Sequence, residues 1–104
     1  MQWIYLFVAG IFEVVWAVAM KYSHGFSVFI PSAITIVGMA LSVFFLALAM
    51  KTLPLGTAYT IWTGIGAVGA FLVGIIAFNE SADFWRFFAV FLIVSGLVIL
   101  KSAH

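Results

Sequence analysis

One acidic side chain falls where a membrane-spanning helix would hold it in hydrocarbon. Glu13 stands in the middle of the apolar residues 3–20. A charged residue at that depth costs roughly 2.5–3.5 kcal/mol on insertion scales, so such residues usually face a bundle interior and serve transport or proton handling. A carboxyl there can hold either a proton or a cation, which is the chemistry of a proton-coupled exchanger. The alternative is a structural carboxyl, protonated and hydrogen-bonded to a neighbouring helix.

Several side chains fall at helical spacing around this carboxyl. Trp16 follows Glu13 by three residues and shares its helix face, so its indole N–H can donate to a carboxylate oxygen. Gly10 flanks the same face and leaves room for a ligand or another helix. Met39 and Ser42 share a face of the second apolar stretch, where Ser42 is the deepest hydroxyl and a second candidate donor.

A stripe of polar and aromatic residues marks the third apolar stretch. Tyr59, Trp62 and Thr63 lie on one helical face. The Tyr59 hydroxyl can donate to a carboxylate, and Trp62 offers its ring face to a cation. The alternative for both aromatic residues is the belt that forms at a membrane–water interface.

Small residues are concentrated in the third and fourth stretches. The third carries Gly64, Gly66, Ala70 and Gly74. The last three form a small-xxx-small ladder that lets helices approach closely, and clustered glycines also permit a bend. Packing and a moving hinge are both consistent with this pattern. Ser95 and Gly96 indicate a weaker helix contact in the fourth stretch, such as a dimer contact.

The composition identifies the elements that must position these residues. The 104 residues are 67% hydrophobic and 7% charged, whereas a soluble domain carries roughly 25% charged residues. This excludes a soluble enzyme, a nucleic-acid binder and a disordered tail. A helix that crosses about 30 Å of hydrocarbon needs roughly 20 apolar residues. The sequence therefore predicts an all-α membrane protein, with one domain over residues 1–104 and helices over residues 3–20, 29–50, 55–78 and 84–100.

The sequence offers no basis for catalysis. It contains no cysteine, and we find no nucleophile–base pair, metal-ligand cluster or phosphate-binding loop. His24 and His104 are isolated and receive no role. We therefore expect no enzyme activity, no catalytic residue, no metal and no cofactor.

The basic residues give no preferred orientation in the membrane. With four spans, Lys51 and Lys101 lie on the side of the amino terminus, while Lys21 and Arg86 lie on the opposite side. Since basic residues in short loops set topology, the bias is two against two. Either another feature fixes one orientation, or chains insert both ways. Two antiparallel copies would supply the inverted repeat that transporters often use and would bring two Glu13 side chains together.

The sequence resembles the small multidrug resistance family along its whole length. The resemblance rests on Gly-Ile-Phe-Glu-Val-Val-Trp at residues 10–16 and Lys-Thr-Leu-Pro-Leu-Gly-Thr-Ala-Tyr-Thr-Ile-Trp-Thr-Gly-Ile-Gly at residues 51–66. It is closest to the guanidinium exporter subtype, of which Trp16 and Lys101 are features. Thr60 departs from the pattern, because alanine is common there in the family and the position is near the implied pocket.

This resemblance implies an antiparallel, dual-topology homodimer in the bacterial inner membrane that exchanges guanidinium for protons. It implies that Glu13 is the shared proton and cation site. It assigns the orientation of the carboxylates to Trp16 and Ser42, the pocket lining to Tyr59 and Trp62, a bend of the third helix to the region of Gly64 and Gly66, and the dimer contact to the fourth helices.

The chemistry of the site favours guanidinium over a quaternary ammonium. Guanidinium is planar and carries only hydrogen-bond donors, so it pairs with a carboxylate through two parallel bonds. A quaternary ammonium has no N–H and needs an aromatic cage instead. A quaternary-ammonium exporter of the same family remains the second hypothesis. A structural or regulatory subunit of a membrane complex is the alternative from another class.

Overall fold

The fold is described by a computed structural model covering residues 1–103, and His104 lies outside the described residues. Within that range the chain forms four helices and no strand, as the apolar stretches predict. These are α1 (Gln2–Tyr22), α2 (Phe29–Ala49), α3 (Leu55–Phe78) and α4 (Phe84–Ala103). Each helix is long and apolar enough to cross a membrane. The fourth helix runs three residues past its expected end and so includes Lys101.

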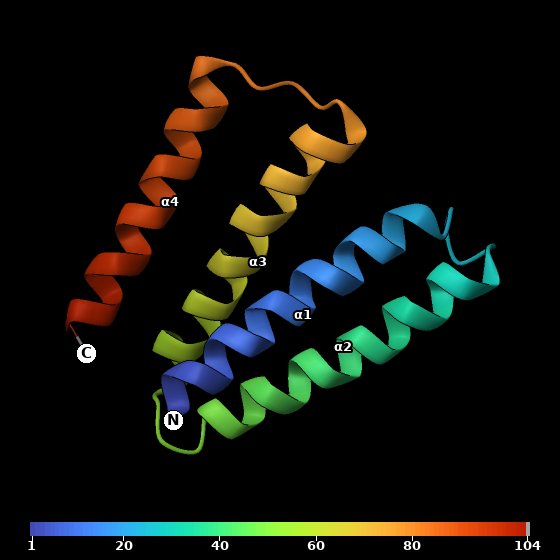
Figure 1. The fold of residues 1–104 in the computed structure, drawn as a ribbon. Helices are drawn as coiled ribbons and strands as arrows, with labels where there is room; N and C mark the ends of the chain where they lie inside the picture. The colour runs from blue at the N-terminus through green and yellow to red at the C-terminus, as the bar shows by residue number, and fades with distance from the viewer. Residues whose placement is uncertain (104) are drawn as a thin grey trace.

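Helix α1 lies between its two neighbours (Figure 1). It packs along α2 and also along α3, whereas α2 and α3 touch each other over a short stretch. Among the described helices, α4 packs mainly against α3, and none of its residues is buried. The buried core consists of Leu6, Ala9, Leu46, Ala49, Leu53, Ala58 and Ile61. It therefore lies where α1 begins, α2 ends and α3 begins.

The ends of the helices follow the local sequence. Pro54 caps the start of α3 in an extended conformation, and Asn79 ends α3 in a left-handed conformation. The backbone N–H of Glu80 then donates to the Gly74 carbonyl at 3.1 Å. Asp83 begins α4 by accepting the backbone N–H of Arg86 at 2.9 Å. The bonds at Glu80 and Asp83 satisfy backbone groups that a helix end leaves unpaired.

The connection between α1 and α2 is a left-handed turn. Gly25 has the positive φ, 74°, that its place after a helix predicts. The sequence did not predict that His24 and Phe26 share this conformation, at φ 48° and 68°. Ser23, which is fully buried, stabilises the turn: its hydroxyl donates to the Met20 carbonyl at 2.6 Å and accepts the Phe26 N–H at 3.0 Å.

Candidate functional site

Glu13 lies on the side of α1 that packs against α3. Its half-buried carboxyl contacts the backbone of α3 at Gly66, where a Cβ atom would overlap it. The interface between α1 and α3, called the α1–α3 seam below, has a second close contact one turn away. There Ile65 of α3 packs against Gly10 of α1, and its Cγ2 lies 2.5 Å from the place of a Gly10 Cβ. Glycine on both helices thus brings α1 and α3 close enough for α3 to cover the carboxyl.

The two oxygens of the Glu13 carboxyl have different surroundings. Oε2 is buried and accepts no hydrogen bond from any described residue, whereas Oε1 keeps some exposure. Trp16 Nε1 is also buried and has no acceptor among residues 1–103. The backbone and Cβ of Trp16 pack against Gly38 of α2, with Cβ 3.1 Å from the place of a Gly38 Cβ. An acceptor without a donor, Glu13 Oε2, and a donor without an acceptor, Trp16 Nε1, therefore belong to residues three apart on one helix face.

Ser42 joins three helices through its hydroxyl. This fully buried hydroxyl donates to the Ala9 carbonyl of α1 at 2.6 Å and accepts the indole N–H of Trp62 from α3 at 2.9 Å. Ala9 precedes Glu13 by about one helical turn. The hydroxyl has one proton to donate, and here that proton goes to Ala9 rather than to Glu13. The expectation that Ser42 orients the carboxylate stays a prediction.

The remaining aromatic and hydroxyl candidates of α3 face a different space. The Tyr59 ring is half exposed and makes an edge contact with Trp62, with ring centroids 5.4 Å apart. Tyr59, Thr60 and Thr63 line a groove of about 680 Å³ between α3 and α4, opposite Gly96 and other small or apolar residues of α4. The structure thus places Tyr59 against Trp62, and it places Thr60 and Thr63 in the groove beside α4.

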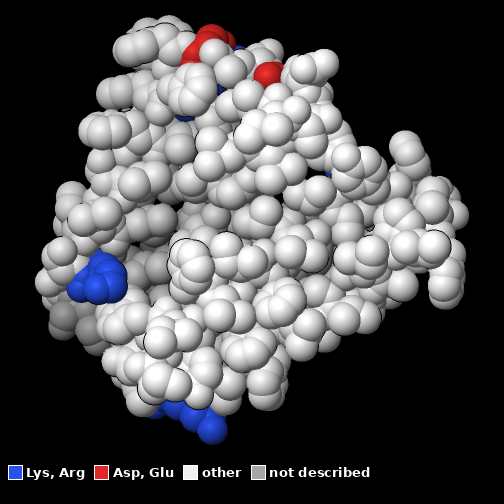
Figure 2. All heavy atoms as spheres, in the orientation of Figure 1, with Lys and Arg blue, Asp and Glu red and all other residues white. Residues whose placement is uncertain are grey.

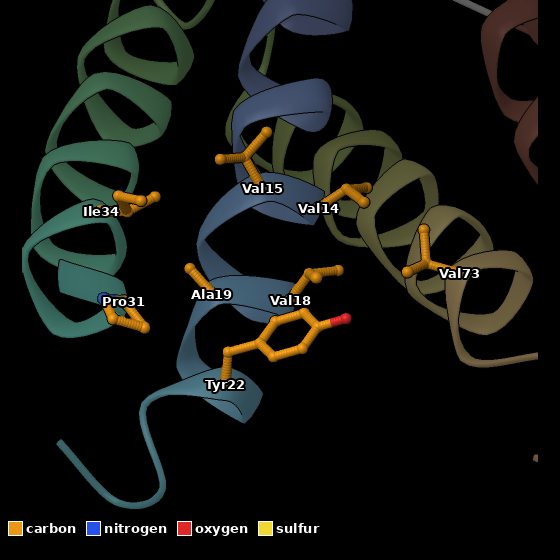
Figure 3. A pocket seen from close by; sticks show the side chains of 8 residues that line it. All are labelled: Val14, Val15, Val18, Ala19, Tyr22, Pro31, Ile34 and Val73. Atoms are coloured by element: carbon orange, nitrogen blue, oxygen red, sulfur yellow. The ribbon is translucent and has the colours of Figure 1, made fainter. Parts of the chain in front are cut away.

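A second groove, of about 450 Å³, crosses α1 between α2 and α3 (Figure 3). Its walls are Val14, Val15, Val18, Ala19, Tyr22, Pro31, Ile34 and Val73. Glu13 does not line it, and Tyr22 carries the one hydroxyl among these side chains. Since its walls are almost wholly apolar, this groove is not the polar site.

The other candidate residues serve contacts between elements. Gly64 faces Leu97 of α4, and Gly74 faces the side chain of Glu80, whereas Ala70 is half-buried in α3. Met39 and Ser95 are half-buried, and Gly96 is exposed. The Lys101 ammonium lies 4.8 Å from the ring centroid of Trp3, a cation–π contact that connects the end of α4 to the start of α1.

Charged groups other than Glu13 lie toward the edges of the molecule. In Figure 2 the face toward the viewer is almost entirely uncharged, with Lys and Arg at its left and lower edges and Asp and Glu at its top. Lys21 lies 5.2 Å from the ring centroid of Phe78, and Arg86 pairs with Asp83 at 2.5 Å on the surface. Among residues 1–103, no group of three or more acidic, histidine or cysteine side chains is placed to hold a metal ion.

Two features of the site left no recognisable signal in the sequence. The acceptor for Ser42 is the Ala9 carbonyl, a backbone group that every residue carries. The close approach of Gly66 to the Glu13 carboxyl also required the structure, because helical spacing assigns Gly66 to a face but does not name its neighbour. The abundance of small residues in α3 was the available hint.

Comparisons with known proteins show which family this chain resembles along its length. Residues 1–93 match the family described as Small Multidrug Resistance protein. The chain is similar to the guanidinium exporter of Salmonella typhimurium (strain LT2), with 58% identity over 105 residues and all of both chains covered. It is 56% identical over 103 residues to the guanidinium exporter of Yersinia pseudotuberculosis serotype I, covering 99% of each chain. It is 55% identical over 105 residues to the guanidinium exporter of Escherichia coli (strain K12), with both chains fully covered.

Proposed function

This chain belongs to the small multidrug resistance family, and on that premise we propose that it is a guanidinium exporter driven by protons. The observation that carries the proposal is full-length identity of 55–58% to proteins named guanidinium exporters. Four apolar helices and this kinship make it a multi-pass bacterial membrane protein. We place it in the inner membrane.

Glu13 is the group through which we propose that protons and substrate exchange. Of the seven charged side chains in the sequence, it is the one in the middle of a helix. Guanidinium presents only donors and needs an ionised carboxylate, so a proton and a cation exclude each other at this oxygen pair. Binding of the cation therefore releases the proton to water, and binding of the proton releases the cation. Exchange requires no further reacting group.

A second copy of the chain, inserted in the opposite orientation, completes the proposed transporter. Alternating access requires the site to open to each side of the membrane in turn, and an inverted pair provides two equivalent openings. The equal numbers of basic residues on the two sides support insertion both ways. The two Glu13 carboxyls would then titrate as a coupled pair.

The proposed function is tested with purified protein in liposomes that contain a pH-sensitive dye. When guanidinium is added outside, its entry must drive protons out, so the lumen should become more alkaline. Glu13→Gln should abolish this response. Glu80→Gln is the matched control, because it removes a carboxylate from the exposed loop after α3, and it should leave the response intact. A small tetraalkylammonium ion should give little response.

Each alternative has its own outcome in this assay. A strong response to the tetraalkylammonium with little response to guanidinium would assign the chain to the quaternary-ammonium exporters. The absence of any response from folded protein would favour a structural or regulatory subunit. A response that survives Glu13→Gln would remove Glu13 from the mechanism.

A further inference from the structure

The Glu13 carboxyl occupies a space that exists because residue 66 has no side chain. A Cβ atom on Gly66 would lie 2.5 Å from Oε2 of Glu13 and 2.8 Å from its Cγ. Gly66 itself is buried, so the carboxyl is covered by the backbone of α3. We call this space the Gly66 seat. The next contact along the seam, between Gly69 and a methyl group of Val14, involves no polar atom.

The Gly66 seat suits a neutral carboxyl better than an ionised one. Oε2 is removed from solvent there and receives no hydrogen bond from any described residue. A charge without a partner costs far more to bury than a neutral polar group. Guanidinium also needs both carboxylate oxygens for its two parallel hydrogen bonds, and α3 covers one of them. The carboxyl as seated is therefore arranged to hold a proton rather than the cation.

Trp16 offers the carboxyl a hydrogen-bond donor on the same helix face. Trp16 follows Glu13 by three residues, and its buried indole N–H has no acceptor among residues 1–103. A carboxylate that moves away from α3 toward Trp16 would accept this hydrogen bond. The movement would satisfy the indole donor and uncover Oε2. The Glu13 carboxylate and the Trp16 indole N–H thus each gain a hydrogen-bond partner in one movement.

We propose that Gly66 is a positioning residue that seats the protonated Glu13 carboxyl, and that the carboxyl leaves this seat toward Trp16 as it gives its proton to water and binds the cation. This inference rests on the proposed function, because it assigns the two forms of one exchange site to two positions of one side chain.

Few ionisable groups of this chain other than Glu13 face the site, and in the proposed inverted pair the second copy adds its own Glu13 carboxyl. Helix α2 contains none, and the one on α3 is Tyr59, two turns before Gly66. On α1 the ionisable side chains other than Glu13 are Tyr5, Lys21 and Tyr22, each at least two turns away. Helix α4 packs on the side of α3 where Gly64 contacts Leu97, away from Glu13. A change in pH dependence on altering Gly66 therefore reports on Glu13.

The test compares Gly66→Ala with Gly69→Ala. Both add one methyl group to the same helix at the α1–α3 seam, but the first meets the carboxyl and the second meets Val14. Guanidinium affinity is measured against pH by calorimetry on purified protein. Without the seat, the protonated form loses stability relative to the cation-bound form. The midpoint should then fall by about half a pH unit or more in Gly66→Ala, a gain of about threefold in affinity at acidic pH. The midpoint of Gly69→Ala should not change.

Equal midpoints in the two variants would overturn the proposal, since Gly66 would then act through helix packing alone. An infrared measurement on the unaltered protein keeps the test decisive if Gly66→Ala does not fold. At acidic pH the proton lies on the exposed Oε1, where it can donate to water, so the buried Oε2 is the carbonyl oxygen. The difference spectrum against Glu13→Gln should therefore show the carbonyl stretch of a carboxylic acid whose carbonyl is free of hydrogen bonds. A hydrogen-bonded carbonyl band would overturn the Gly66 seat.

The failure of this inference is distinguishable from the failure of the proposed function. If the unaltered protein binds no guanidinium, the proposed function fails, and the infrared band still decides whether the carboxyl lies in the Gly66 seat. If guanidinium binds and both variants have the same midpoint, the exporter remains and the seat fails.

Discussion

At the scale of single residues, the Ser42 hydroxyl shows how a site is built from backbone as well as side chains. Ser42 accepts from Trp62 and donates to the Ala9 carbonyl, so one buried hydroxyl connects α1, α2 and α3. It can donate to Glu13 only by leaving Ala9, because a hydroxyl has a single proton. The Ser42 hydroxyl therefore cannot orient the Glu13 carboxylate and hold α1 through Ala9 at the same time.

Removal of this hydroxyl should destabilise the protein. In Ser42→Ala the indole N–H of Trp62 loses its acceptor, and an unsatisfied buried donor costs about 1–3 kcal/mol. Trp62→Phe in the same chain removes that donor, so the double variant should lose less than the sum of the single losses. Unfolding in detergent measures the four free energies. Ser32→Ala is the control, because the Ser32 hydroxyl donates locally, to the carbonyl of Val28 directly before α2, and joins no two helices. Strict additivity would show that the Ser42–Trp62 bond contributes nothing.

The residue types of the site could be read from the sequence, but most of their partners could not. Helical spacing assigned Glu13 and Trp16 to one face because that relation is set within a single helix. Whether Ser42 meets Glu13 or Ala9 depends on how α1 and α2 are set against each other. That setting follows from contacts such as Gly38 on Trp16, which a single helix does not encode.

At the scale of elements, the turn between α1 and α2 carries conformational strain. His24 and Phe26 adopt a left-handed backbone, which costs roughly 1–2 kcal/mol for a residue with a Cβ atom. The buried hydroxyl of Ser23 holds the turn in place. The turn therefore fixes how α2 starts its return beside α1.

Two glycines on different elements should respond oppositely to alanine. Gly25 has a φ of 74° and no atom near the place of its Cβ, so Gly25→Ala should lose about 1 kcal/mol or more through backbone strain alone. Gly56 lies in α3 with equally open space, and there alanine should gain up to about 1 kcal/mol through helix propensity. Unfolding in detergent compares the two. A stabilising Gly25→Ala would mean that this turn is not left-handed in the membrane protein.

The docking of α4 onto α3 depends on Gly64. A Cβ atom there would lie 2.5 Å from one terminal carbon of Leu97 and 2.7 Å from the other. Gly64→Ala should therefore cost about 1–3 kcal/mol through overpacking. Leu97→Ala removes the opposing atoms, so the double variant should recover at least about 0.5 kcal/mol relative to additivity. Thermal unfolding of the four proteins measures this coupling. Full additivity would place the two residues out of contact.

The existence of the elements was predictable, whereas their packing was less so. Hydrophobic length alone predicts four spans, because water cannot satisfy backbone groups in hydrocarbon and the chain must form helices there. The bend expected in the region of Gly64 and Gly66 stays a prediction, and α3 is one helix of 24 residues. The two glycines face α4 and α1 respectively. The spacing of Gly64 and Gly66 in the sequence does not show that they contact two different helices.

At the scale of the whole molecule, the packing of α4 and the distribution of charge both bear on whether two copies of the chain pair in opposite orientations. Helix α4 packs on α3 but buries no residue within the described chain. The amino terminus, Lys51 and Lys101 lie at one end of the helices, and Lys21 and Arg86 lie at the other. Because α4 is apolar and packs on one side only, its other side suits a second copy of the chain. The balance of basic residues suits a copy inserted in the opposite orientation. This is the basis for the pairing proposed above.

The orientation of the chains is directly measurable because the sequence contains no cysteine. Ala103→Cys places one exposed thiol near the end of α4. In spheroplasts, a membrane-impermeant maleimide should label roughly half of the protein, and the remainder should react after permeabilisation, because basic residues are balanced. Labelling from one side only would exclude antiparallel pairs.

Charge changes then connect orientation to transport. Thr52→Lys adds a basic residue to the side of Lys51, and Ser81→Lys adds one to the side of Arg86. Each variant alone should insert mostly one way, since basic residues in short loops set topology. Each should therefore lose most guanidinium transport for want of an inverted partner. Co-expression of the two should restore transport, because neither substitution touches the site around Glu13. Full transport by a variant with one-sided labelling would show that parallel chains suffice, and the inverted pair would then not be the unit that exports.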